Sequence, residues 1–372
     1  MRFRYGIEHE LAILRGRDVP AFVDFTDLGF GELQAVVDAL PEDPADYPDL
    51  RVGDQGIKRK RWYVEGYERF DDAGELVRCD PKGLEVRTRI HDSVEAAVTA
   101  LGADVDLLTA ELWPRGLATC AIGFNPLRSE YVIDPPLGEW ERAHRIGSPE
   151  ERTAHLHMVT YGPDLNLSAD GLDVLDAARK LTHYSPWLVP LSFSSPFRDG
   201  APWGGLSART HLRTGARPAA LAFLGPDAAQ IVSDPSLTQP ARLPAEIGRL
   251  EFKAFDAIGD LTLYGELLSL LTGLVLDQTL PGRRTTPDAA AHRHVATVGL
   301  ADDAVHRETG ALLAAAEAAL AERPADLARM AGLRARWDRR ECAASAMLAA
   351  HAAGASLAEV IAASATRPRR SP

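Results

Sequence analysis

The chain has 372 residues, of which 46% are hydrophobic and 25% are charged, so it carries enough apolar material for the core of a large globular protein. Its 41 basic and 53 acidic residues give a net charge of −12, which disfavours a nucleic-acid-binding protein, because such proteins normally present a basic face. The longest apolar run, at 267–276, is about half of the roughly 20 residues that a membrane helix needs, so no membrane partner is predicted. Charges crowd the N-terminus where a secretion signal would be apolar, and we therefore expect a cytoplasmic protein.

The first segment, FRYGIEHE at 3–10, alternates apolar and polar residues with the period of a strand that buries one face. Glu8 and Glu10 then point to the same, polar side. In chain order, the pattern next predicts a helix over 31–40, an acidic connection over 42–56, strands over 61–70 and 83–90 joined by a turn at 71–75, and a helix over 93–112 with Ser93 as its N-cap.

Strands and helices continue to alternate irregularly after this helix. The predicted elements are a strand over 117–124, an alternating stretch within 158–168, a helix over 172–188, a Ser/Gly/Pro-rich loop over 192–205, strands over 220–224 and 248–255, and a buried helix over 261–280. Residues 300–364 are rich in Ala, Leu, Glu and Arg and predict three or four helices, followed by a disordered tail over 366–372. Because no steady βαβ rhythm appears, we expect an α+β fold with a mainly antiparallel sheet.

Acidic residues recur on the polar sides of otherwise apolar strands, at Glu8, Glu10, Glu65, Glu85, Asp164 and Glu251. A sheet face lined with carboxylates repels itself unless positive charge lies on it, because unpaired buried charge is costly. For any single carboxylate, a solvated face or a salt bridge to Arg2, Arg4 or Arg87 is the simpler interpretation. As a set, oxygen ligands without Cys indicate Mg²⁺ or Mn²⁺, and Mg²⁺ usually binds together with substrate phosphates.

Arginines supply candidate partners for such phosphates. The stretch SARTHLRTGARPA at 207–219 carries Arg209, Arg213 and Arg217, whose planar guanidinium groups suit carboxylates and phosphates. Their spacing of four residues fits the exposed face of a short helix equally well. The basic run at 58–61 is interpreted as a solvated entry to a strand rather than a phosphate site.

Other common signatures of catalysis are missing from the sequence. There is no P-loop, no glycine-rich dinucleotide motif after a strand and no nucleophile elbow. His155 and His157 would coordinate zinc from alternate strand positions, but no third ligand stands at a helpful spacing, so a structural or outer role is favoured for both.

Six segments stand out when the chain is read in order: GIEHE at 6–10, GLEVRT at 83–88, PDLNLS at 163–168, SFSSPFRDG at 192–200, SARTHLRTGARPA at 207–219 and GRLEFKAFD at 248–256. Together, over roughly 1–290, they resemble the glutamate–cysteine ligase family of type 2, and most of all its cyanobacterial-type branch. That family belongs to the carboxylate-amine ligases and has a glutamine-synthetase-like catalytic fold.

The resemblance implies an ATP-dependent ligation. The γ-carboxylate of glutamate would be phosphorylated, and the acyl phosphate would then be attacked by an amine, normally that of cysteine, in the first step of glutathione-type thiol synthesis. It implies metal ligands for Mg²⁺ or Mn²⁺ at Glu8, Glu10, Glu85 and Glu251. Asp164 stands where relatives carry His or Gln, so it is a further expected metal contact with a changed ligand type.

The resemblance also implies which residues bind substrate and ATP. Arg209, Arg217 and Lys253 are the expected catalytic and substrate-binding residues, and Asn166 is an expected contact to substrate or ATP. Lys253 stands where relatives often carry Arg, so the positive charge is kept but the bidentate geometry is lost.

Several alternatives stay open at this stage. The acceptor is cysteine or another amine or amino acid, and a non-catalytic binding protein with the same fold is a third reading. The complete carboxylate set argues against the third reading, because a decayed site would be expected to lose members. We expect a catalytic domain over 1–295, a helical segment over 296–372, and small-molecule substrates rather than nucleic acid or membrane as partners, with the oligomeric state left open.

Overall fold

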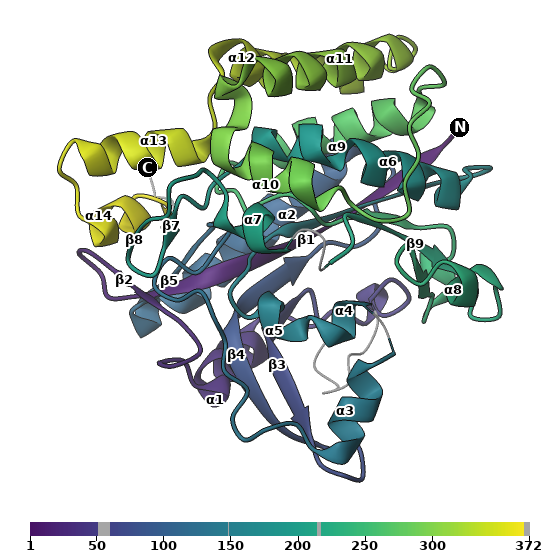
Figure 1. The fold of residues 1–372 in the computed structure, drawn as a ribbon. Coiled ribbons are helices and arrows are strands. Elements are labelled where there is room, and N and C mark those ends of the chain that lie inside the picture. Colours follow the sequence, from purple (N-terminus) through teal and green to yellow (C-terminus); the bar gives the residue numbers. More distant parts are fainter. Residues whose placement is uncertain (51–59, 148, 214–216, 368–372) are drawn as a thin grey trace.

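The computed structural model describes residues 1–50, 60–147, 149–213 and 217–367. These residues form an α+β fold around one large curled sheet (Figure 1). The strands of the large sheet are β1 (Phe3–Arg15), β2 (Ala21–Val23), β3 (Trp62–Phe70), β4 (Leu76–Arg87), β5 (Leu117–Cys120), β6 (Pro163–Ala169), β9 (Ala220–Leu224), β10 (Thr238–Pro240), β11 (Leu250–Phe252) and β12 (Ala365–Thr366). A separate small hairpin joins β7 (Phe197–Arg198) and β8 (Ala201–Pro202).

Strand β1 is the central strand of the sheet. The strand order is β10-β9-β11-β6-β1-β4-β3, and the C-terminal half of β1 pairs with β2 and β5. Strand β10 runs parallel to β9, so the sheet is mixed, which corrects the prediction of a mainly antiparallel sheet. A three-residue edge strand that ends in proline has too little periodicity to be recognised from sequence. The strands that carry the acidic residues pair in antiparallel fashion.

The predicted alternation of the first strand is confirmed and separates two environments. Phe3, Tyr5 and Ile7 are buried on the core side of β1, while Glu8 lies on the other side. From Leu11 to Leu14 the strand is buried on both sides, as expected of a strand covered on both faces. The strand extends to Arg15, beyond the predicted segment.

Helices cover both sides of the sheet. They are α1 (Phe30–Ala39), α2 (Val94–Leu112), α3 (Glu139–Arg145), α4 (Pro149–Arg152), α5 (Ala154–His157), α6 (Val174–Leu188), α7 (Ala208–Arg213), α8 (Gln230–Ser233), α9 (Leu261–Leu276), α10 (Ala289–Val298), α11 (Asp303–Ala319), α12 (Pro324–Arg339), α13 (Ala343–Ala352) and α14 (Leu357–Ala362). Helices α2, α6 and α9 pack together against the core side of the sheet, and α3 and α5 lie against β3 on the other side (Figure 1). The predicted N-cap is confirmed, because the Ser93 hydroxyl accepts a hydrogen bond from the Ala96 backbone N–H.

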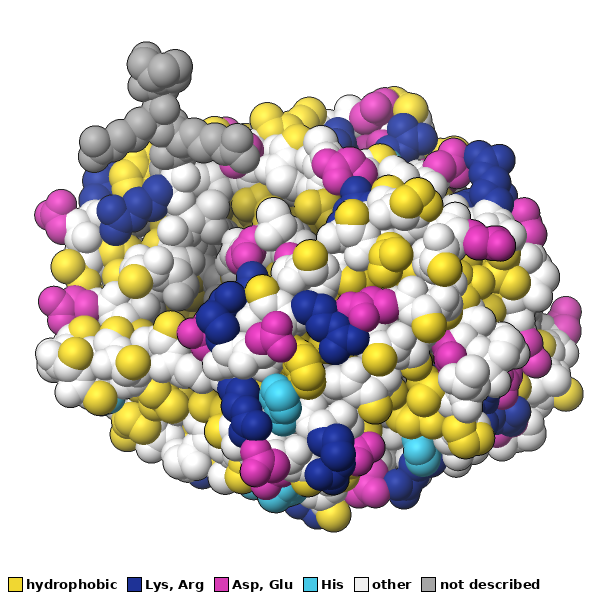
Figure 2. Space-filling model, turned by 90° about the horizontal axis from the view of Figure 1, so that it is seen from above, with side chains coloured by type: hydrophobic (Ala, Val, Ile, Leu, Met, Phe, Trp, Pro, Cys, Tyr) yellow, Lys and Arg dark blue, Asp and Glu magenta, His cyan; other side chains and the backbone are white. Residues whose placement is uncertain are grey.

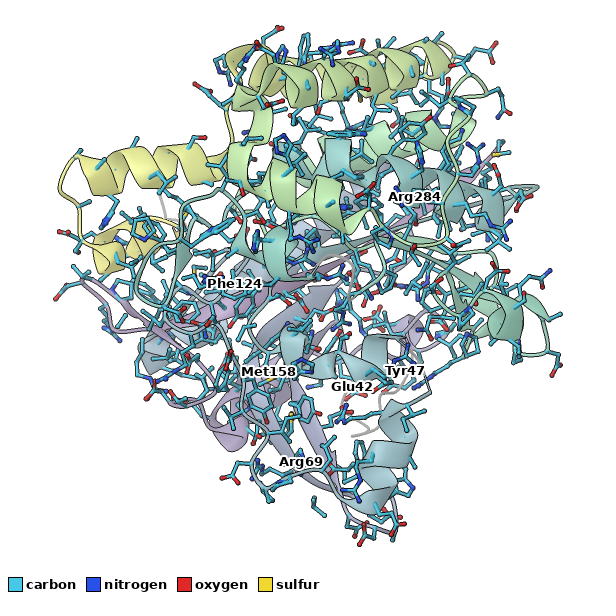
Figure 3. The ribbon with its side chains drawn as sticks, in the orientation of Figure 1. Glu42, Tyr47, Arg69, Phe124, Met158 and Arg284 are labelled. Atoms are coloured by element: carbon cyan, nitrogen blue, oxygen red, sulfur yellow. The ribbon has the colours of Figure 1, made fainter. Side chains whose placement is uncertain are left out.

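The hairpin predicted within 61–90 is confirmed, although its second strand begins earlier, at Leu76. Three short helices occupy 139–157, where no helix was predicted. Arg69 of β3 holds the first of them through two hydrogen bonds of 2.8 and 3.0 Å to the Glu141 carboxylate. Figure 3 shows Arg69 at the end of the hairpin beside α3.

Of the basic run at 58–61, Lys60 and Arg61 stand just before β3, at the predicted strand entry, and Lys58 and Arg59 lie outside the described residues. Lys60 donates hydrogen bonds to backbone carbonyls at the end of α1. Arg61 pairs with Asp46 and Asp104 at 3.0 and 2.7 Å. These two charges therefore serve local structure.

Residues 300–364 fold into four helices, α11 to α14, in agreement with the sequence prediction. Helices α11 and α12 pack against α9, and on the face seen from above acidic and basic side chains are intermingled (Figure 2). The predicted disordered tail is wrong at its first residue, because Thr366 pairs with Thr119 of β5 in a short strand. Residues 368–372 lie outside the described part of the chain. Within that part, no helix is both long and apolar enough to cross a bilayer.

Candidate active site

The register of the sheet brings the predicted carboxylates to one face. Glu10 of β1 is opposite Glu85 of β4, and Glu8 is opposite Asp164 of β6. On the far side of β6, Asn166 is opposite Glu251 of β11. Residues directly opposite in antiparallel strands share a face, as do residues two apart in one strand. The predicted clustering of these carboxylates on one face is thus confirmed.

A cavity of about 490 Å³ opens over this acidic face. Three of the predicted carboxylates line it, namely Glu8, Asp164 and Glu251. Glu10 and Glu85 lie beyond them on the same face, toward the β3–β4 hairpin. The site therefore has a cavity end and a hairpin end, joined by the polar side of β1.

Two of the carboxylates, Asp164 and Glu85, are held in an environment that opposes their ionisation. The pKa of Asp164 is raised to about 7, mainly by burial and also by the Glu251 carboxylate, against the opposing effect of the Lys253 ammonium. Burial, followed by the neighbouring Glu65 and Glu8 carboxylates, raises the pKa of Glu85 well above its usual range. Several buried carboxylates without enough positive charge form a donor set that fits a hard divalent cation such as Mg²⁺ or Mn²⁺.

Two cations stand among the carboxylates at the cavity end. The Lys253 ammonium lies 2.8 Å from Glu251 and 3.2 Å from Asp164, so this predicted residue lies at the site. The Arg249 guanidinium lies 3.3 Å from Glu8 and 3.2 Å from Glu251. Sequence reasoning missed Arg249, although the alternation of the last motif places it on the same face as Glu251 and Lys253.

Asn166 of β6 hydrogen-bonds to charged side chains on both sides of its strand. Its side-chain amide donates to Glu8 Oε1 at 3.2 Å, and its carbonyl oxygen accepts from Arg249 at 3.1 Å. The amide is buried and lines the cavity. This predicted substrate contact therefore orients the charged groups around it and also faces the space that a substrate would enter.

The hairpin end contains a lysine and a histidine that were not assigned to the site. Lys82 Nζ donates to Glu10 Oε1 at 2.7 Å and contacts His157 Nδ1 at 3.1 Å. The other ring nitrogen of His157 lies 2.6 Å from Glu65. The prediction that the two histidines sit on a strand is wrong, because His155 and His157 belong to the short helix α5. Four residues are too few to show a helical period in the sequence.

The ionisation of Glu10 and His157 depends on burial and on the charge of Lys82, whose own pKa is lowered by burial. Burial alone raises the pKa of Glu10, but the Lys82 ammonium and His157 outweigh it, so the pKa of Glu10 lies below its usual range. Burial, and then Lys82, lower the pKa of His157. At neutral pH, Glu10 is therefore an anion and His157 is a neutral imidazole.

Arg209 and Arg217 are placed away from the 490 Å³ cavity. The Arg209 guanidinium donates to the backbone carbonyls of Ala254 and Lys253, both at 2.9 Å. Both arginines line a separate narrow space. Arg209 and Arg213 sit on the short helix α7 but are buried, so the interpretation of this stretch as an exposed helix face is wrong. In this arrangement Arg209 holds the chain segment that carries Lys253.

Arg209→Met is expected to lower the free energy of unfolding by about 3 kcal/mol, because two buried carbonyls lose their donors. Urea unfolding followed by circular dichroism measures this loss. Arg209→Lys keeps a charged donor and should lose less. An Arg209→Met protein as stable as the wild type would show that the guanidinium does not support this backbone and would return Arg209 to a direct role with substrate.

The fold is similar to the folds of two solved ligases. A bifunctional glutathione synthetase from Pasteurella multocida matches with a TM-score of 0.55 at 12% identity, over 97% of this chain and 51% of that chain. A glutamate–cysteine ligase from Francisella tularensis, solved in complex with AMP, matches with a TM-score of 0.53 at 13% identity, over 98% of this chain and 87% of that one. The chain thus spans about half the length of the bifunctional protein. A search of curated proteins finds no match.

The likeness to these two ligases shows the fold that the chain shares with them. The model of the family described as Glutamate-cysteine ligase family 2 matches residues 4–232, which is more than half of the chain. The protein belongs to this family, and the resemblance inferred from the six motifs is confirmed.

Proposed function

We propose that the protein is an ATP-dependent ligase that joins the γ-carboxylate of glutamate to an amine through a γ-glutamyl phosphate. Cysteine is the first candidate for the amine, because family membership supports it. The observation that carries the proposal is the cavity in which carboxylates from β1, β6 and β11 face two fixed cations.

The carboxylates would hold the metal ions that accompany the nucleotide. Glu8, Asp164 and Glu251 at the cavity, and Glu85 beside them, supply oxygen donors of the kind that Mg²⁺ and Mn²⁺ prefer. Bound there, the metal would neutralise phosphate oxygens of ATP. Glu10, the fifth predicted ligand, already accepts hydrogen bonds from Lys82 and from the Gly162 backbone N–H.

Lys253 and Arg249 would stabilise the charge that moves during phosphoryl transfer. This transfer needs alignment and charge neutralisation more than covalent help, and cationic side chains commonly provide both. Lys253 and Arg249 are tied to carboxylates on two sides, so their positions are fixed before substrate binds. Asn166 keeps Glu8 and Arg249 in register through its two hydrogen bonds.

Further arginines line the cavity, together with the acidic residues Asp49, Glu151 and Glu246. Arg4, Arg89 and Arg242 line it, and guanidinium groups suit the carboxylates of amino acids as well as phosphates. This supports substrates that are amino acids rather than simple alkylamines. We propose 1–295 as the catalytic domain and 296–372 as an accessory helical segment.

Phosphate release from ATP and Mg²⁺ with glutamate, measured across a panel of amines, tests the proposal. We expect release to require glutamate and an amine together and to be fastest with cysteine. A higher kcat/KM with a different amino acid would assign the same chemistry to that acceptor. If no glutamate and amine pair supports turnover, the proposal is wrong, and the non-catalytic reading of the fold is favoured.

A further inference from the structure

The ammonium group of Lys82 lies entirely inside the protein, at the hairpin end of the acidic face. The side chain is 0% exposed, and it contacts Glu10 Oε1 at 2.7 Å and His157 Nδ1 at 3.1 Å. The backbone carbonyls of His157 and Thr160 accept from the same nitrogen at 3.0 and 2.8 Å. Four acceptors thus surround a group that has only three hydrogens to donate. The charge is fully satisfied without water.

A β-bulge brings Lys82 to this position. Glu65 of β3 is opposite Gly83, and the next residue, Gly66, is opposite Pro81, so Lys82 is the extra residue in β4. Strict alternation would place Lys82 on the core side with Leu84. Bulges change the direction of a side chain in this way. A Cβ on Gly83 would lie 2.2 Å from the Leu11 carbonyl oxygen, so this close approach of the two backbones requires glycine.

The surroundings of Lys82 have the dimensions of a metal site. Glu10, Glu65 and His157 each offer one possible ligand atom, and these three atoms lie within 4.8 Å of one another. Because a lysine ammonium can only donate, His157 Nδ1 must accept, and the imidazole proton is then on Nε2, where it donates to Glu65 Oε1 at 2.6 Å. The hydrogen-bonded chain therefore runs from Glu10 through Lys82 and His157 to Glu65.

We propose that Lys82 is a permanent internal cation that takes the place of one divalent ion at the Glu10 end of the acidic face. Exchangeable metal is then confined to the cavity end, at Glu8, Asp164 and Glu251, while Glu85, which is opposite Glu10, borders that end. Glu10 becomes a positioning residue, held by Lys82 and by the Gly162 N–H. The inference deepens the proposed function, because it specifies which part of the acidic face takes up metal.

Lys82→Met removes the charge but retains the bulk of the side chain. Mn²⁺ titrated alone, without ATP, glutamate or amine, is counted by electron paramagnetic resonance. We expect the variant to bind one more Mn²⁺ per chain than the wild type. The gain should disappear in Lys82→Met/His157→Ala, which lacks the imidazole ligand. If Lys82→Met folds poorly, Lys82→Gln takes its place in the test. This variant keeps a hydrogen-bond donor toward Glu10 but has no charge, and it should also bind one more Mn²⁺ per chain than the wild type.

Lys180→Met is the matched control. Lys180 is also buried, but its ammonium donates to the backbone carbonyls of Leu274 and Asp277 rather than to a carboxylate cluster. Its loss should leave the number of bound Mn²⁺ ions unchanged. Melting temperatures give a second readout: Lys82→Met should melt lower than the wild type in EDTA and should gain more from Mn²⁺.

Equal metal counts and equal Mn²⁺ stabilisation in the wild type and both Lys82 variants would overturn the inference. The inference would also be overturned if the single variant His157→Ala bound fewer Mn²⁺ ions than the wild type, because a metal would then already occupy the position given to Lys82. Metal counting does not depend on turnover, so the two proposals can fail separately. If the wild type is inactive but Lys82→Met binds an additional Mn²⁺, the proposed ligase is rejected and this inference stands. If the wild type is active but Lys82→Met binds no additional Mn²⁺, the proposed ligase stands and this inference is rejected.

Discussion

Glu8→Gln is expected to reduce kcat/KM for ligation by about 10³-fold, or about 4 kcal/mol in the barrier, with little change in melting temperature. Glu8 lies in the cavity, opposite Asp164 and 3.3 Å from Arg249. The amide of glutamine keeps the shape and can still accept a hydrogen bond from Arg249. It loses the negative charge that a divalent cation needs. Steady-state phosphate release at saturating Mg²⁺ measures the effect.

Glu95→Gln is the control for this variant. Glu95 also pairs with an arginine, Arg329 at 2.6 Å, but its side chain is 74% exposed on α2, outside the site. Its activity should match the wild type. A Glu8→Gln enzyme with wild-type kinetics would remove Glu8 from metal binding, whatever the control does.

Lys253→Met is expected to lower kcat/KM by about 10²-fold to 10³-fold, mostly through kcat, because the lost charge would act on the transferred phosphoryl group in the transition state. The ammonium sits between Glu251 and Asp164 on the cavity wall. Initial rates at varied ATP and glutamate separate kcat from KM.

Lys253→Arg is the conservative counterpart of this variant. It keeps the positive charge and should recover most of the activity, because the proposed role is electrostatic. If Lys253→Met keeps kcat within about twofold of the wild type, the lysine serves only to pair Glu251 and Asp164. If Lys253→Arg is as inactive as Lys253→Met, the geometry of the ammonium matters more than its charge.

The acidic face was predictable because the signal is local. Strict alternation in the first strand puts Glu8 and Glu10 on one side, and the structure confirms it. The same reasoning could have found Arg249, which stands two residues before Glu251 in GRLEF.

Contacts between distant strands were beyond sequence reasoning. Asp164 and Lys253 meet because β11 pairs with β6, and one sequence does not specify that register. Arg209 was expected at the substrate because guanidinium groups bind phosphates. The structure turns it toward the backbone of Lys253 and Ala254 instead, where it is buried and neutralises two carbonyl dipoles.

The hairpin end was missed for a different reason. A β-bulge breaks the period of two, so alternation assigns Lys82 to the core side, away from Glu85. His157 comes from a helix of only four residues, and its contact with Glu65 depends on how that helix lies over β3. Neither feature has a periodic pattern that a sequence window could detect.

The central claim is that glutamate is activated as an acyl phosphate, and isotope transfer tests it most directly. Glutamate labelled with ¹⁸O in its γ-carboxylate is turned over with ATP, Mg²⁺ and the preferred amine, and the released phosphate is analysed by mass spectrometry. The account predicts that the phosphate carries one labelled oxygen, because the carboxylate oxygen that attacks ATP leaves with the phosphoryl group when the amine forms the amide. Phosphate without label, or label found in AMP, would contradict the account.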